Sequence, residues 1–146
     1  MLLGGTPFSK LFLSVRDALG LTYYCESSLD FFTGTIYVES GFSKGREQMV
    51  LDAVLVQIQA LISGDITEEQ FLKTKLFIRN KMLSYYESAA LLEEWCIDEI
   101  IQSNFRAPRA LAEEIEILTL KEVKEVASKL EVTAKYVLYA QGEEVL

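Results

Sequence analysis

Two residues near the start of the chain, Arg16 and Tyr23, have the types and the spacing of a pair of hydrogen-bond donors. They stand on either side of Gly20 in the stretch "SKLFLSVRDALGLTYYCESS". A guanidinium and a phenol that flank a chain reversal can both donate to one carbonyl or carboxylate oxygen of a ligand. The alternative is structural, because arginines at helix ends are usually solvated and tyrosines in strands usually pack against their neighbours.

The chain contains no histidine. This excludes Ser-His and Cys-His nucleophile systems and removes the commonest ligand of a catalytic zinc ion. The carboxylates Glu93, Glu94, Asp98 and Glu99 lie close in sequence, but neighbouring positions on a helix diverge by about 100°, which indicates a solvated helix face. We therefore expect no catalytic residue and no metal site in this chain, and any hydrolytic activity needs chemistry from outside it.

Composition indicates an ordinary globular protein and limits its partners. Half of the residues are hydrophobic, a quarter are charged, and 22 acidic against 14 basic residues give a net charge of −8. No basic stripe is present that could follow phosphates, so nucleic acid is not an expected partner. The apolar run "MVLDAVLVQIQALI" is too short to span a bilayer, and "MLLGG" lacks the features of a signal peptide. Two cysteines in no recognisable spacing favour a reducing compartment, so we expect a cytoplasmic protein without a membrane anchor.

The first elements that position Arg16 and Tyr23 are a helix and a hairpin. Thr6 and Pro7 predict a helix start, and Gly20 predicts its end. One apolar face is formed between them by Phe8, Leu11, Phe12, Val15 and Leu19. From Leu21 the period becomes two, so that Leu21, Tyr23 and Cys25 share one face of a strand. The turn "LDFFTG" then leads to a second strand, "TIYVESGF", and the two strands predict an antiparallel hairpin.

Five helices and a last strand are predicted after the hairpin. The helical patterns fall within 43–64, 67–86, 91–105, 108–118 and 119–130. The residue pairs Thr67 with Gln70 and Thr119 with Glu122 have the spacing of capping boxes at two of the helix starts. The segment "AKYVLYAQG", at 134–142, is rich in strand-forming residues and predicts a final strand.

This order of elements predicts an α+β fold, in which a small sheet containing antiparallel strands carries a helical array on one face. We expect one domain over 1–146. A helix that precedes every strand indicates that a first strand is missing, so we expect the chain to be a piece of a longer protein. A sheet that lacks a strand has an exposed edge, and a homodimer through this edge is one way to cover it.

The stretch "LGGTPFSKLFLSVRDALGLTYYCESS" resembles a motif of the pitrilysin and insulinase metallopeptidases, the M16 family. The motif is LGG-x-x-x-S-[KR]-L-F-x-x-V-R-E-x-x-G-L-x-Y, from the half of those proteins that lacks zinc. The stretches "ITEEQFLKTKLFIRNKMLSYYES" and "LTLKEVKEVASKL" resemble two later helices of the family, and the resemblance covers nearly the whole chain. The chain departs from the motif at Asp17, where glutamate is more frequent, and Tyr24 adds a second tyrosine beside Tyr23.

The resemblance implies a βαββ-type half-domain, here apparently lacking its first strand. In the family such a half pairs with a homologous half that carries zinc through HxxEH and a distal glutamate, and the two halves enclose a peptide substrate. Arg16 and Tyr23 match the two residues that bind the substrate backbone. The implied function is a substrate-binding domain, inactive alone, whose partner domain or subunit holds the zinc. The alternative is a structural or interaction domain of a catalytically inactive M16-like subunit.

Overall fold

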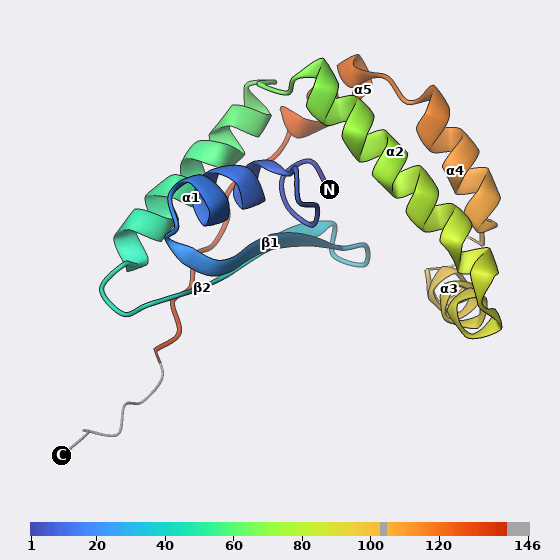
Figure 1. Cartoon of the computed structure of the whole chain (residues 1–146), viewed down its shortest axis with the longest axis horizontal. Helices are drawn as coiled ribbons and strands as arrows, with labels where there is room; N and C mark the ends of the chain where they lie inside the picture. Colours follow the sequence, from blue (N-terminus) through green and yellow to red (C-terminus); the bar gives the residue numbers. More distant parts are fainter. Residues whose placement is uncertain (103–104, 140–146) are drawn as a thin grey trace.

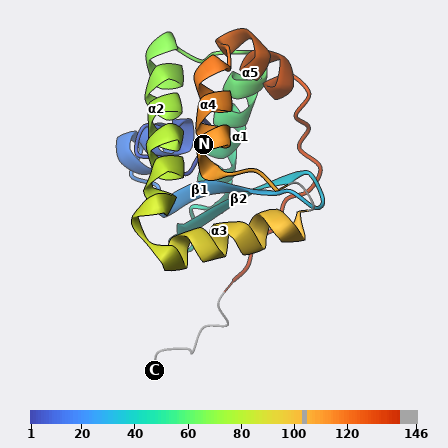
Figure 2. The same cartoon turned by 90° about the vertical axis from the view of Figure 1, so that its right-hand side faces the viewer.

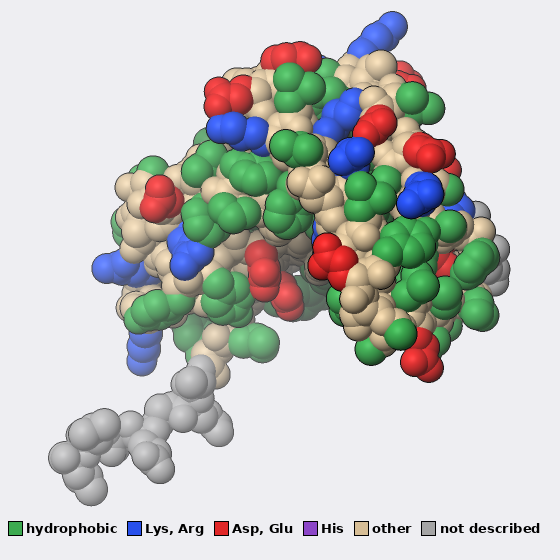
Figure 3. Space-filling view, turned by 45° about the vertical axis from the view of Figure 1, so that its right-hand side comes forward, with side chains coloured by type: hydrophobic (Ala, Val, Ile, Leu, Met, Phe, Trp, Pro, Cys, Tyr) green, Lys and Arg blue, Asp and Glu red, His purple; other side chains and the backbone are tan. Residues whose placement is uncertain are grey.

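The chain folds into a two-stranded antiparallel sheet with helices arched over one side (Figure 1). The computed structural model describes residues 1–102 and 105–139. The hairpin is covered by η1 and α1, α2 and α4 lie side by side, and α3 crosses their far end (Figures 1 and 2). This α+β arrangement confirms the predicted fold class. Hydrophobic side chains are exposed at many places on the surface, as the space-filling view shows (Figure 3). In chain order the elements are η1 (Phe12–Ala18), β1 (Thr22–Asp30), β2 (Thr35–Phe42), α1 (Glu47–Ile62), α2 (Glu68–Ser84), η2 (Tyr85–Glu87), α3 (Ala89–Ile101), α4 (Pro108–Ile117) and α5 (Leu120–Ala127).

The predicted hairpin is confirmed, and its turn is held by Asp30. The Asp30 carboxylate accepts hydrogen bonds from the Phe32 backbone N–H at 2.9 Å and from the Thr33 hydroxyl at 2.8 Å. These two bonds, that from the Thr33 side chain first, lower the pKa of Asp30. Gly34 completes the turn in the left-handed region, with φ of 66°. The turn is therefore built by local side-chain chemistry that the sequence already contains.

The pairing of β1 with β2 is interrupted at Tyr23. Thr22 lies opposite Phe42, whereas Tyr24 lies opposite the next residue, Gly41. Tyr23 is thus an extra residue in β1, a β-bulge, and such a residue shifts the side chains that precede it relative to those that follow. The alternation expected across Leu21, Tyr23 and Cys25 is therefore broken at this point.

The first helix begins later than the sequence predicts. It starts at Lys10 and widens into the π-helix η1. The predicted Thr6 cap is wrong, since the Thr6 hydroxyl is buried and has no hydrogen-bond partner in the described part of the chain. Instead, the N–H groups of Lys10 and Leu11 donate to the carbonyls of residues 2 and 3, at 3.0 and 2.9 Å. The folded-back N-terminal segment thus supplies the acceptors that a side-chain cap would otherwise provide. Gly20, with φ of 58°, ends the helical segment as predicted.

The five predicted helices after the hairpin are confirmed as α1 to α5. Both capping boxes are present, with Thr67 and Gln70 at the start of α2 and Thr119 and Glu122 at the start of α5. The bonds from Thr119 lower the pKa of the Glu122 carboxyl. No helix in the described ranges is long and apolar enough to cross a membrane.

The last predicted strand is wrong over its described part. Residues 134–139 form neither helix nor strand, and residues 140–142 of the prediction lie outside the described residues. Tyr136 and Leu138 are 89% and 96% exposed. Strand-forming residues need a neighbouring edge and an apolar surface to pack on, and this segment has neither here.

The expectation of a solvated acidic face on the 91–105 helix is wrong for Glu99. This side chain is buried, and its carboxylate accepts a hydrogen bond from the Arg106 backbone N–H at 2.8 Å. The Trp95 indole N–H donates to the carbonyl of the same residue at 2.9 Å. Both side chains therefore fasten the chain that returns from α3 toward α4.

Candidate functional site

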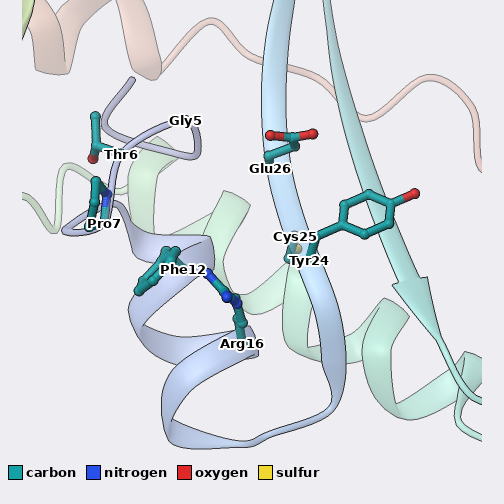
Figure 4. A pocket seen from close by; sticks show the side chains of 8 residues that line it. All are labelled: Gly5, Thr6, Pro7, Phe12, Arg16, Tyr24, Cys25 and Glu26. Atoms are coloured by element: carbon teal, nitrogen blue, oxygen red, sulfur yellow. The ribbon is translucent and has the colours of Figure 1, made fainter.

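A hollow of about 220 Å³ lies along the edge of β1 that does not pair with β2 (Figure 4). We call it the edge groove. Three segments form its walls, namely the N-terminal loop, η1 and β1. The lining residues are Gly5, Thr6, Pro7, Phe12, Arg16, Tyr24, Cys25 and Glu26.

The N-terminal wall of the edge groove depends on close contact between backbones. A Cβ added at Gly4 would overlap the backbone nitrogen of Ser27 in β1, and Gly5 has φ of 95°. The close approach needs a glycine at the first of these positions, and the left-handed conformation favours a glycine at the second. The "GG" of the sequence therefore serves to seat the loop against β1, a role that the sequence alone did not reveal.

Arg16 lines the edge groove, as a binding residue should. Its guanidinium lies 4.6 Å from the centre of the Phe12 ring, and both side chains occupy the same end of the groove (Figure 4). The Arg16 side chain is exposed and forms no ion pair within the described ranges. The cation–π contact holds the guanidinium in place while leaving its N–H donors free for another partner.

Tyr23 lies outside the lining of the edge groove. The residue is 75% exposed, and its hydroxyl lies 3.3 Å from the Ser43 hydroxyl. No hydrogen bond joins it to Arg16 in the part of the chain that the structure describes. The structure thus places the two residues on either side of Gly20 without bringing them onto one surface of the groove, and their pairing stays a prediction.

Tyr24, the second tyrosine, lines the edge groove, but its ring points away from the groove and packs against β2. Its ring extends across β2, away from Arg16 (Figure 4). A Cβ on Gly41, its partner in the ladder, would run into this ring. The Tyr24 ring therefore fills the space that Gly41 leaves open, which is a packing role.

Glu26 is the lining residue that the sequence analysis missed. It is exposed at the end of the edge groove away from Arg16 (Figure 4) and lies directly opposite Glu39 in the ladder. Neither glutamate has an ion pair in the described ranges. Between Arg16 and Glu26 lies Cys25, whose buried thiol has a pKa raised by burial. The edge groove consequently has a positively charged side chain at one end and a negatively charged side chain at the other.

The described residues do not fit a zinc site. Over residues 1–102 and 105–139, no three His, Cys, Asp or Glu side chains gather in a way that could hold a metal ion. The zinc that the resemblance implies would have to be bound by another domain or subunit.

Solved structures share this fold. A conserved protein from Enterococcus faecalis V583 matches with a TM-score of 0.76 at 30% identity, covering 89% of this chain and 31% of that chain. A protease from Helicobacter pylori matches with a TM-score of 0.75 at 17% identity, covering 88% and 32%. The class of protein is thus an α+β domain of the kind found within chains about three times as long.

Sequence comparison then gives the family. The family described as "Peptidase M16 inactive domain" matches residues 1–76, so the chain belongs to this M16 family. It is 28% identical over 137 residues to "Probable inactive metalloprotease YmfF" of Bacillus subtilis (strain 168), covering 94% of this chain and 32% of that protein. It is also 28% identical over 132 residues to "Uncharacterized zinc protease ML0855" of Mycobacterium leprae (strain TN), covering 88% and 29%. The chain spans about a third of the length of these relatives. The resemblance drawn from the sequence is confirmed.

Proposed function

We propose that this chain is a non-catalytic, substrate-binding domain of an M16-like zinc peptidase. In this proposal it contributes Arg16 and Tyr23 to a cleft whose zinc site lies in a complementary M16-like domain or subunit, and the substrate is a peptide. The observation that carries the proposal is the Arg16 guanidinium, which lies in the edge groove without a carboxylate partner in the described ranges.

The two donors have complementary chemistry for binding a peptide. The Arg16 guanidinium is always charged and presents several N–H groups to a carbonyl oxygen. The Tyr23 hydroxyl is bound to Ser43 at 3.3 Å, longer than a strong O–H···O bond, so a ligand oxygen can replace that partner at little cost. Zinc in the complementary domain supplies an activated water when bound. Donors aimed at the attacked carbonyl would stabilise the charge that develops on its oxygen.

The test is a pair of substitutions, Arg16→Ala and Tyr23→Phe, in the intact assembly. We expect kcat/KM for peptide cleavage to fall about 10-fold or more in each variant. Tyr24→Phe is the matched control, because that ring is a neighbour that packs against Gly41 and should leave kcat/KM unchanged. Unchanged kcat/KM in both Arg16→Ala and Tyr23→Phe, or a loss confined to Tyr24→Phe, contradicts the proposal.

A second candidate function is that of a structural domain in a catalytically inactive M16-like subunit. It is favoured by one relative, whose name describes an inactive metalloprotease. The two candidates differ in what accompanies the chain. An HxxEH motif in the complementary domain or subunit, with cleavage that depends on Arg16, supports the first. Absence of that motif, with normal assembly in the Arg16→Ala variant, supports the second.

A further inference from the structure

We propose that Arg46 is a positioning residue for the Arg16–Tyr23 pair and that Ser43 positions the Tyr23 phenol. In this inference neither residue contacts the substrate, and both act through the two donors. The inference rests on the proposed function. It adds the short turn between β2 and α1, residues 43–46, as the segment that fixes how the two donors stand to each other.

The reversal at Gly20, which joins η1 to β1 (Figure 4), separates the two donors and is held by little packing. Apart from its chain neighbours, no atom lies within 4 Å of a Cβ built on Gly20, and Leu19 is 56% exposed. The N–H groups on either side of Gly20 donate to η1 carbonyls at 3.2 and 3.3 Å, which is long for such bonds. Because a rotation at this glycine would move one donor relative to the other, their geometry depends on what else holds the reversal.

Arg46 supplies a side-chain anchor to this reversal. Its Nη1 donates to the Gly20 carbonyl at 3.2 Å, the only side-chain hydrogen bond to residues 17–21 within the ranges that the structure describes. The Arg46 guanidinium forms no ion pair in those ranges, so no carboxylate competes for it. A guanidinium holds its N–H groups in a fixed plane and therefore fixes the direction of this bond. Loss of the Arg46 side chain would free the Gly20 carbonyl and let the reversal turn.

Ser43 holds the phenol of the second donor. Thr22 pairs with Phe42, the last residue of β2, so Ser43 lies beyond that pair on the side of Gly20. The 3.3 Å contact between the Tyr23 and Ser43 hydroxyls therefore directs the phenol back toward the reversal. Both hydroxyls can donate and accept. When a ligand oxygen accepts from Tyr23, the Ser43 hydroxyl can donate to the phenol oxygen instead, and the phenol keeps its place.

The turn that carries Ser43 and Arg46 is held by contacts of its own. The Arg46 N–H donates to the Ser43 carbonyl at 3.2 Å, and the Gly45 N–H donates to the Glu47 carboxylate at 3.0 Å. The second of these bonds is the main cause of the lowered pKa of Glu47. Gly45 has φ of 89°, a conformation that favours glycine. Since these contacts are local, both positioning side chains are in place before a ligand binds.

The experiment measures kcat and KM for peptide cleavage by the intact assembly. Arg46→Met should lower kcat about 10-fold and leave KM nearly unchanged, because a displaced donor is lost to the transition state more than to the bound substrate. Arg46→Lys keeps a donor for the Gly20 carbonyl and should restore most of the loss. Ser43→Ala should lower kcat by about 3-fold, as expected for one hydrogen bond. Lys44→Met is the matched control and should match the wild type, because Lys44 is an exposed cation of the same turn with no hydrogen bond to the reversal in the described ranges.

Two further measurements separate positioning from a general loss of structure. In an assembly that already carries Arg16→Ala and Tyr23→Phe, Arg46→Met should cause no further loss, because the residues through which it acts are gone. A 3-fluorotyrosine placed at position 23 reports on the phenol by ¹⁹F NMR without any need for cleavage. Its resonance should move or broaden in Arg46→Met and in Ser43→Ala, and stay unchanged in Lys44→Met.

Three results would overturn the inference: a further loss in the doubly substituted background, a raised KM with unchanged kcat in Arg46→Met, or an unmoved fluorine resonance. The proposed function fails separately. If Arg16→Ala and Tyr23→Phe cleave normally while the resonance moves, the proposed function fails and the turn still positions Tyr23. If those two variants lose activity and the resonance does not move, the proposed function stands and the positioning role fails.

Discussion

Substitution of Gly4 by alanine tests whether the N-terminal loop is seated on β1. The added Cβ would overlap the backbone nitrogen of Ser27 and crowd the carbonyl carbon of Glu26. These are ladder atoms, so no side-chain rotation can relieve the contact. Gly4 does not have a positive φ, and the expected cost is therefore steric rather than conformational.

The expected cost of Gly4→Ala is about 2 kcal/mol of unfolding free energy. Forcing a group into a packed site typically costs 1–3 kcal/mol, roughly the range expected here. If the loop retreats instead, Leu3, which is only 5% exposed, loses its burial, and this is again worth about 1.5–3 kcal/mol. Both routes lead to a similar loss, which for a chain of this size lowers Tm by roughly 7 °C.

Urea unfolding and thermal circular dichroism measure this loss. The matched control is Gly34→Ala in the hairpin turn, where φ is 66° and no atom lies within 4 Å of an added Cβ. The unfolding free energy of that variant should fall by about 1–2 kcal/mol, because alanine is strained in the left-handed conformation, and the edge groove stays intact. A Gly4→Ala variant as stable as the wild type would refute the close contact.

Three further predictions concern single contacts. Thr67→Ala and Thr119→Ala each remove a capping box and should lower the unfolding free energy by about 1 kcal/mol in urea titrations. The lowered pKa of Asp30 means that its carboxylate stabilises the fold above about pH 4 and loses this effect as pH falls through its native pKa. Asp30→Ala should therefore be less stable than the wild type at pH 7, with a gap that closes on acidification; a gap independent of pH would contradict this. Glu99→Ala leaves the Arg106 N–H without its acceptor and should cost about 1–3 kcal/mol, measured from the fluorescence of the single tryptophan.

Elements whose signals are local could be predicted from the sequence. The capping boxes that begin at Thr67 and Thr119 each span only four residues, and both are present at the starts of α2 and α5. The hairpin has the same character, since Asp30 and Gly34 hold its turn without help from distant residues. Such elements depend on backbone and side-chain chemistry within one or two turns, which is the range that a sequence pattern describes.

The errors lie where distant segments decide the structure. The sequence places a cap at Thr6, but the carbonyls of residues 2 and 3 serve the first helix instead. The sequence also predicts a strand at 134–142, but residues 134–139 form none. A strand is stable only when it pairs with the edge of another strand, and the residue pattern of the segment does not say whether such an edge is available. Glu99 reads as one of several exposed acids, although its position at the return toward α4 makes it a buried acceptor.

The candidate site was predicted in part for the same reason. Arg16 is found by its motif, whereas Glu26 becomes a lining residue only when the N-terminal loop lies against β1. The bulge at Tyr23 also could not be predicted, and it matters for the proposed role. A regular strand would place Tyr23 on the face of Cys25, which is buried, and its hydroxyl would then be inaccessible. The extra residue instead leaves Tyr23 exposed, and bulges near binding sites commonly re-aim a side chain in this way. The bulge therefore leaves the Tyr23 hydroxyl accessible, as the proposed role of Tyr23 requires.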